Sequence, residues 1–169
     1  MADTLLKGGE YLIAETKSED VFTPEDFSDE QRQFGETTEQ FVTNELLPKI
    51  EEIDNQNFDI VVEGMRQCGE LGLLMMDAPE EYGGLDLDKA SSMLVAERIA
   101  ISGSFSVAYA AHTGIGTLPL IYYGTHEQKE KYLEKLITGE WCSAYCLTEP
   151  GSGSDALGAQ ASAVLSEDG

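Results

Sequence analysis

Basic residues are scarce in this 169-residue sequence, which holds 10 lysines and arginines against 32 aspartates and glutamates. The net charge of -22 would repel a nucleic-acid backbone and an anionic membrane face, which excludes nucleic acid as a partner. Cysteine is scarce too: Cys68, Cys142 and Cys146 are odd in number and widely spaced, which argues against a disulfide framework. We therefore expect a reducing, cytoplasmic location.

The residue pattern also predicts neither a signal peptide nor a membrane-spanning segment. The opening MADTLLKGGEYLIAE lacks the basic region and apolar core of a signal peptide. Residues 99–125 carry, apart from tyrosine, only one ionisable side chain, His112, as a transmembrane span would. Serines, threonines, four glycines and Pro119 make the stretch too polar, and a helix buried on all sides of a helical domain is equally free of charge. We expect no membrane span.

What is present predicts a helical bundle over residues 26–140, after an extension over residues 1–25. Start signals occur in TPED (23–26), SDEQ (28–31) and THEQ (125–128). Apolar residues recur every three to four positions after the second and third signals and over 61–71, which indicates about five amphipathic helices in all. Pro48 should bend or end the first, the charge-poor stretch 103–123 should break near 116–119, and residues 73–88 should form a structured loop.

The periodicity changes after Gly139. WCSAYCL (141–147) and AQASAVL (159–165) are short, uncharged and without helical spacing, so both are predicted to be strands. Two strands make only the start of a sheet. The predicted fold class is therefore mainly α: an N-terminal helical bundle, followed over residues 141–169 by the first strands of a truncated β-domain.

Between the two predicted strands, the stretch TEPGSGSDA (148–156) is the main candidate site. GSGSDA fits the letters of a dinucleotide-binding fingerprint, but no long periodic helix follows it, and its glycines fall at the wrong offsets for a nucleophilic serine elbow. Glycine leaves backbone N–H groups sterically open, and Thr148, Ser152 and Ser154 add hydroxyls. Such a loop can donate hydrogen bonds to a cofactor's polar edge or its pyrophosphate.

Other chemistry-bearing residues have simpler explanations. Glu149 and Asp155 could form a carboxylate pair, but their spacing in an irregular loop fixes no distance, so turn capping or binding of backbone amides is favoured. Cys142 and Cys146 would lie ~13 Å apart on a strand, too far for one metal ion. His112 and His126 are expected to be structural histidines.

Four blocks of the sequence carry a family resemblance. YCLTEPGSGSDA (145–156) resembles the flavin-binding signature of acyl-CoA dehydrogenases. LGLL (71–74), PEEYGG (79–84) and YGTHEQKEKYLEKLITGEW (123–141) look like the N-terminal helical domain of the same family, in the same order. The resemblance covers about residues 28–169. The KGGEYLI segment near the N-terminus is similar to the longer, long-chain-type branch.

The resemblance implies an FAD-dependent enzyme with a helical domain, a middle β-domain and a C-terminal four-helix domain, assembled as a homodimer or homotetramer. Such enzymes oxidise an acyl-CoA thioester to the trans-2-enoyl-CoA in fatty-acid β-oxidation. Their catalytic base lies in the C-terminal domain, so this chain would hold no catalytic residue, and by itself would be inactive and bind flavin weakly or not at all. The residues implied to contact FAD are Tyr145, Cys146, Leu147, Thr148, Gly153 and Ser154. Ser154 and Ala111 are implied to contact the acyl-CoA substrate.

Three questions stay open at this level. Small residues at helical spacing, Ser104, Ala108, Ala111 and Ile115, would leave room for a long acyl chain, but close helix packing explains them equally well. The chain could also be a non-catalytic helical interaction module, or belong to an acyl-CoA oxidase. Because CoA carries phosphates, the acidic charge requires the other domains to supply the basic contacts.

Overall fold

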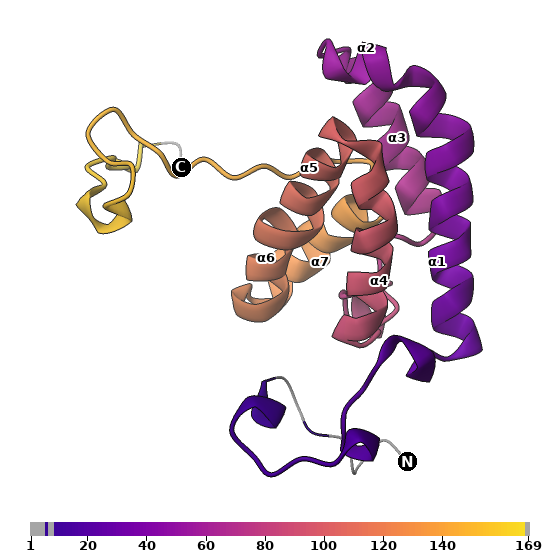
Figure 1. The fold of residues 1–169 in the computed structure, drawn as a ribbon. Helices are drawn as coiled ribbons and strands as arrows, with labels where there is room; N and C mark the ends of the chain where they lie inside the picture. The colour runs from indigo at the N-terminus through magenta and orange to yellow at the C-terminus, as the bar shows by residue number, and fades with distance from the viewer. Residues whose placement is uncertain (1–5, 7–8, 168–169) are drawn as a thin grey trace.

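The computed structural model describes residue 6 and residues 9–167, and helices dominate this part of the chain (Figure 1). The α-helices are α1 (Asp29–Phe41), α2 (Ile50–Asp54), α3 (Phe58–Glu70), α4 (Lys89–Ile99), α5 (Ser104–Ala110), α6 (Leu118–Tyr123) and α7 (His126–Ile137). Two π-helices, η4 (Val42–Leu46) and η8 (Ala111–Thr117), and two 3-10 helices, η5 (Leu47–Lys49) and η7 (Ala100–Ser102), extend them. The described residues thus form a bundle of five continuous helical runs, and the chain is mainly α as predicted.

Isolated 3-10 turns occupy the connections and the ends of the chain. They are η1 (Glu10–Leu12), η2 (Ser18–Asp20), η3 (Pro24–Asp26), η6 (Glu80–Tyr82) and η9 (Ala156–Gly158). The first three belong to the N-terminal segment, which lies below the bundle in Figure 1. η6 belongs to the loop between α3 and α4.

The predicted start signals are capping boxes. At α1, the backbone N–H of Gln31 donates to the Ser28 hydroxyl (3.2 Å), while the side-chain oxygen of Gln31 accepts from the backbone N–H of Ser28 (2.9 Å). Thr125 and Gln128 repeat the arrangement at α7, at 3.3 and 2.9 Å. Each box satisfies N–H groups that the first helical turn leaves without a partner. The sequence therefore predicts where both helices begin.

The two prolines change the type of helix without ending the helical run. Pro48 lies in the 3-10 helix η5, and the chain passes from α1 through η4 and η5 into α2. Pro119 lies in the first turn of α6, directly after the π-helix η8. The predicted break near residues 116–119 is wrong: the chain stays helical there, because the wider π-turns of η8 lead directly into α6.

The core lies where α1, α3, α4 and α5 meet. Phe105 is fully buried at its centre, with Phe41 at a ring-centroid distance of 6.5 Å. Gly64 of α3 lies so close that a Cβ there would come within 2.6 Å of the Phe105 ring. A second cluster, built on Ile121, Leu133 and Ile137, packs α6 against α7. Burial of these apolar side chains is the main stabilising contribution to the bundle.

The loop between α3 and α4 is structured, as predicted. The N–H of Leu85 donates to the Met75 carbonyl (2.9 Å) and that of Leu87 to the Met76 carbonyl (2.7 Å). A Cβ at Gly84 would lie 1.9 Å from the carbonyl oxygen of Ala78, so only glycine fits there. The loop thereby closes one side of the core.

The two predicted strands do not form. After α7 the chain leaves the bundle in an extended path and ends in a separate loop (Figure 1). A strand needs a neighbouring segment for its ladder of hydrogen bonds, and within residues 9–167 neither 141–147 nor 159–165 has one. The only β-bridge in this described part is the isolated pair Glu149–Ser152.

Candidate functional site

The π-helix η8 holds the point at which the C-terminal segment leaves the bundle. His112, in this helix, is buried, and its side chain lies between two backbone groups from other parts of the chain. Its Nε2 is 3.0 Å from the carbonyl oxygen of Leu136 in α7, and its Nδ1 is 3.0 Å from the amide nitrogen of Ser143. One imidazole thus joins η8, α7 and the departing segment.

These two contacts determine the protonation state of His112. A carbonyl can only accept, so Nε2 carries the proton and donates to Leu136. An amide N–H can only donate, so Nδ1 is unprotonated and accepts from Ser143. Burial lowers the pKa of His112, with a smaller opposing effect from the Leu136 carbonyl. The ring is therefore neutral and satisfied, and the prediction of a structural histidine is confirmed.

Hydroxyl groups complete this junction. The carbonyl of His112 accepts from the Thr117 hydroxyl (2.6 Å) and from the Ser143 hydroxyl (3.1 Å). Gly116 lets the two segments touch, since a Cβ there would lie 2.2 Å from Ser143 Oγ and 2.7 Å from Ser143 Cβ. π-Helical segments are frequent at functional sites, and here the segment fixes the path of residues 143 onward.

Beyond the junction, Glu149 organises the loop of residues 148–156. Its carboxylate accepts from the backbone N–H groups of Gln160 (2.8 Å) and Ala161 (3.1 Å). Its backbone exchanges hydrogen bonds with Ser152, whose buried hydroxyl donates to the Asp155 carbonyl (2.5 Å). The prediction that Glu149 binds backbone amides is confirmed. Within the described residues, the Glu149 side chain thus connects the start of the loop to the segment that follows it.

The rest of this loop has free donors. The hydroxyls of Thr148 and Ser154 make no hydrogen bond within the described part of the chain, and both residues are exposed. A Cβ placed on Gly151 or Gly153 would meet nothing within 4 Å. Free hydroxyl donors of this kind can bind the hydrogen-bond acceptors along the edge of a cofactor such as FAD, so the residues present are compatible with that group.

The segment before the loop presents the other predicted contacts. Tyr145 and Leu147 are exposed by 51% and 40%, and Cys146 is exposed as well. Side chains of this size stay exposed because nothing in the described chain covers this stretch. These positions are free to contact a ligand, and their assignment to FAD stays a prediction.

A groove of about 320 Å³ runs over α4, α5, η8 and α6. Its lining is mainly apolar, including Leu73, Met76, Ala110, Gly114 and Leu118. Lys89 and Asp77, which form an ion pair, stand at its polar edge. Apolar lining with few polar groups is typical of small-molecule sites. The groove can take an aliphatic chain.

The predicted row of small residues lies beside this groove. Ala111 and Ala108 are half-buried, Ile115 is exposed, and Ser104 donates a hydrogen bond to Asp54 (2.5 Å). The same helical run lines the groove with the neighbouring positions 110, 113, 114 and 117. A contact of Ala111 with the substrate stays a prediction.

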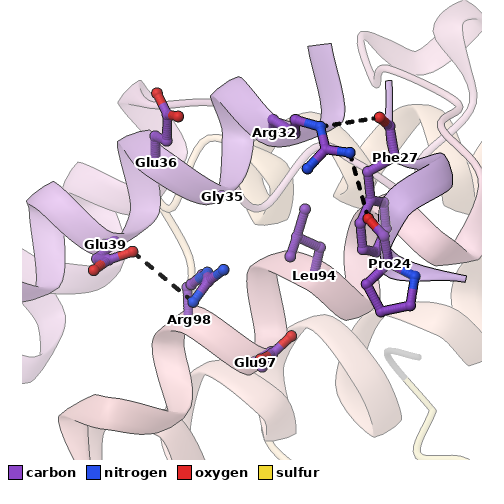
Figure 2. A pocket seen from close by; sticks show the side chains of 9 residues that line it. All are labelled: Pro24, Phe27, Arg32, Gly35, Glu36, Glu39, Leu94, Glu97 and Arg98. Carbon is purple, nitrogen blue, oxygen red and sulfur yellow. Dashed lines mark hydrogen bonds and ion pairs between the residues drawn. The ribbon is translucent and has the colours of Figure 1, made fainter. Parts of the chain in front are cut away.

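Figure 2 shows a second cavity, of about 390 Å³, between α1 and α4. Arg32 on its wall donates to the carbonyls of Phe27 (3.1 Å) and Glu25 (2.9 Å), which anchors the N-terminal segment to α1. Glu36, Glu39 and Glu97 also line it. These three carboxylates outnumber the two guanidinium groups of the lining, Arg32 and Arg98, and Arg98 already pairs with Glu39 at 3.9 Å, so the lining is net negative and does not favour a phosphate-bearing ligand.

Sequence reasoning missed the junction of Gly116, Thr117 and Ser143 with His112. Ser143 and His112 are 31 residues apart, and no local pattern reports such a contact. The nearest signal was the pair of glycines at 114 and 116 inside a charge-poor helix, since a glycine in a helix often marks a close backbone approach.

Comparison with known proteins identifies the helical part. A family model described as "Acyl-CoA dehydrogenase, N-terminal domain" matches residues 28–140. A probable acyl-CoA dehydrogenase of Bacillus subtilis is 52% identical over 163 residues, which cover 96% of this chain and 27% of that protein. A mitochondrial isovaleryl-CoA dehydrogenase of Solanum tuberosum is 41% identical, over 85% of this chain and 35% of that protein.

Solved structures show the same fold. An acyl-CoA dehydrogenase from Bacillus anthracis, crystallised with FAD, is 53% identical and superposes with a TM-score of 0.87. The match covers 92% of this chain and 27% of that one. The chain therefore spans about a quarter to a third of the length of these relatives.

Among its described residues, no helix is long and apolar enough to cross a membrane.

Proposed function

The chain belongs to the acyl-CoA dehydrogenase family, and from this premise we propose that it is the N-terminal part of an FAD-dependent enzyme. The whole enzyme would convert acyl-CoA to trans-2-enoyl-CoA in fatty-acid β-oxidation, as a cytoplasmic homodimer or homotetramer. The observation that carries the proposal is the loop of residues 148–156, whose free hydroxyls and open glycines suit a flavin.

In this proposal the residues from Tyr145 to Ser154 hold the cofactor. Thr148 donates to the edge of the isoalloxazine ring, and Ser154 lies near the cofactor's pyrophosphate and the CoA part of the substrate. Bound FAD supplies the hydride acceptor of the reaction. Glu149 keeps its carboxylate on the amides of Gln160 and Ala161, so it shapes the loop and takes no part in proton transfer.

The substrate's acyl chain would lie along the apolar groove over α5 and η8. Val107 and Ile115, on the same helical run, are exposed by 70% and 46%, and Met93 of α4 by 66%. Exposed apolar patches of this kind mark surfaces that another domain or a ligand covers. We expect the rest of the enzyme to cover this face and to supply the catalytic base and the basic contacts for CoA.

The cofactor assignment is tested by removing one free hydroxyl. In the protein expressed from its complete reading frame, Thr148→Val should weaken FAD binding roughly 2- to 13-fold, the equivalent of one hydrogen bond of about 0.5–1.5 kcal/mol. Thr138→Val is the matched control, because the Thr138 hydroxyl is engaged with the Glu134 carbonyl at the end of α7. Equal FAD affinity in the two variants would contradict the assignment.

A further inference from the structure

Two segments far apart in sequence meet at His112, and the loop proposed to hold the flavin begins five residues after that contact. Ser143 is held to the bundle at two points: its backbone N–H donates to Nδ1 at 3.0 Å, and its hydroxyl, whose oxygen lies 3.1 Å from Nδ1, donates to the His112 carbonyl at 3.1 Å. From Ala144 to Leu147, the described structure gives the segment no hydrogen bond to the bundle. The direction in which the loop is presented therefore depends on Ser143.

We propose that His112 is a positioning residue, which in its neutral Nε2–H form ties Ser143 to α7 and so sets the placement of residues 145–154 on the cofactor. This inference rests on the proposed function, since it assigns a role within that site. His112 touches neither cofactor nor substrate in it. The ring acts as a bridge with one donor and one acceptor, and only the neutral imidazole offers both.

Protonation of His112 would break the bridge. An imidazolium carries N–H groups on both nitrogens, so Nδ1 would face the Ser143 N–H as a second donor, while the bond from Nε2 to Leu136 would remain. The Ser143 hydroxyl could turn to accept from Nδ1, but the amide would lose its partner. Acid should therefore release the Ser143 amide N–H while leaving the helical bundle in place.

The titratable groups beside His112 on its own helical run and on the departing segment are neutral, so the change in protonation concerns the imidazole alone. On the departing segment the neighbouring titratable group is Cys142, whose pKa is raised by burial, so it is a neutral thiol. On the helical run of His112, Tyr109 is also neutral, because burial raises its pKa and its hydroxyl donates to the Leu73 carbonyl.

Charged side chains on two of the other packed helices form ion pairs at the surface. On α7, Lys135 pairs with Glu140 at 3.2 Å. On α3, whose C-terminal end packs against Thr138, Arg66 pairs with Glu63 and Glu70. Burial and the Leu136 carbonyl account for the pKa shift of His112, and no charged side chain of the described residues contributes to it.

The chain offers matched variants. In His112→Gln the side-chain amide has one donor and one acceptor about as far apart as the two ring nitrogens, and it does not titrate. His112→Phe fills the same space and offers neither. His126→Gln is the control, since His126 is the other histidine of the chain and lies on the surface beside Tyr82 and Glu130.

The test is amide hydrogen exchange of Ser143, by NMR on this chain without flavin. In the wild type and in His126→Gln we expect protection relative to the intrinsic rate near neutral pH and a roughly tenfold loss on acidification, about what one hydrogen bond contributes. His112→Gln should keep the protection at both pH values. His112→Phe should lack it at both, with the helical circular dichroism unchanged.

The proposal would be overturned if the protection of the Ser143 amide from exchange is independent of pH in the wild type. It would also be overturned if that protection persists in a folded His112→Phe variant. If His112→Phe fails to fold, the comparison of wild type with His112→Gln decides: a pH step in both, or in neither, counts against it. In the full-length enzyme, FAD affinity should fall in His112→Phe and be kept in His112→Gln. The exchange experiment contains no flavin, so a negative result would contradict the role of His112 and leave the proposed function standing. A full-length protein that binds no flavin would contradict the proposed function and leave the contact between His112 and Ser143 standing.

Discussion

Replacing Gly116 by alanine should separate the C-terminal segment from the bundle. The added Cβ would lie 2.2 Å from Ser143 Oγ, 2.7 Å from Ser143 Cβ and 2.9 Å from the Ala111 carbonyl oxygen. Rotating the serine hydroxyl removes only the first overlap, so the backbone of residue 143 must move. Overpacking of this kind costs about 1–3 kcal/mol, and the better helix propensity of alanine returns about 0.5–1 kcal/mol. We expect a net loss of up to about 2.5 kcal/mol in the free energy of unfolding.

Gly114, two residues earlier in the same π-helix, provides the control. A Cβ there meets nothing within 4 Å, so Gly114→Ala should stabilise the chain by about 0.5–1 kcal/mol. Followed by circular dichroism, the melting temperature should fall by up to about 10 °C in Gly116→Ala and rise by about 1–4 °C in Gly114→Ala. Equal shifts in the two variants would refute the close approach of Ser143 to η8.

Three further predictions concern His112, the cysteines and Ala111. Burial lowers the pKa of His112 below its ordinary value of 6.5, so as the pH falls the unfolded chain takes up a proton on this ring before the folded chain does. The contribution of His112 to the free energy of unfolding, measured by urea titration, should therefore be complete above pH 6.5 and fall as the pH drops toward the folded-state pKa. Cys68 is fully buried and its pKa is raised to about 12, so a thiol reagent should modify only the exposed Cys146 and, more slowly, Cys142 in the folded chain; rapid modification of all three would contradict the packing of α3. In the full-length enzyme, Ala111→Leu should depress turnover of long acyl-CoA substrates more than short ones, and equal effects would indicate that small residues there serve helix packing.

Local signals in the sequence predicted the local features of the fold. The capping boxes at Ser28 and Thr125 mark the starts of α1 and α7, because a hydroxyl followed three residues later by glutamine satisfies exposed N–H groups wherever it occurs. The loop before α4 was predicted from its glycines and proline. Such features depend on a few neighbouring residues, which a single sequence displays directly.

Features that depend on distant partners were not predicted. Residues 141–147 and 159–165 have strand-like composition, but a strand forms only beside another one, and the described chain offers none. The π-helix η8 has the same apolar pattern as an α-helix, so its wider turns give no signal in the sequence. The Glu149 carboxylate was expected to bind amides, but the sequence could not show that they belong to Gln160 and Ala161.

Reductive titration tests the central proposal most directly. The protein expressed from its complete reading frame would be reconstituted with FAD and titrated with acyl-CoA in the absence of oxygen. The account predicts stoichiometric bleaching of the oxidised-flavin absorbance by acyl-CoA and, because the catalytic base would lie outside residues 1–169, no bleaching with this chain alone. A full-length protein that binds no FAD, or whose flavin spectrum acyl-CoA leaves unchanged, would contradict it.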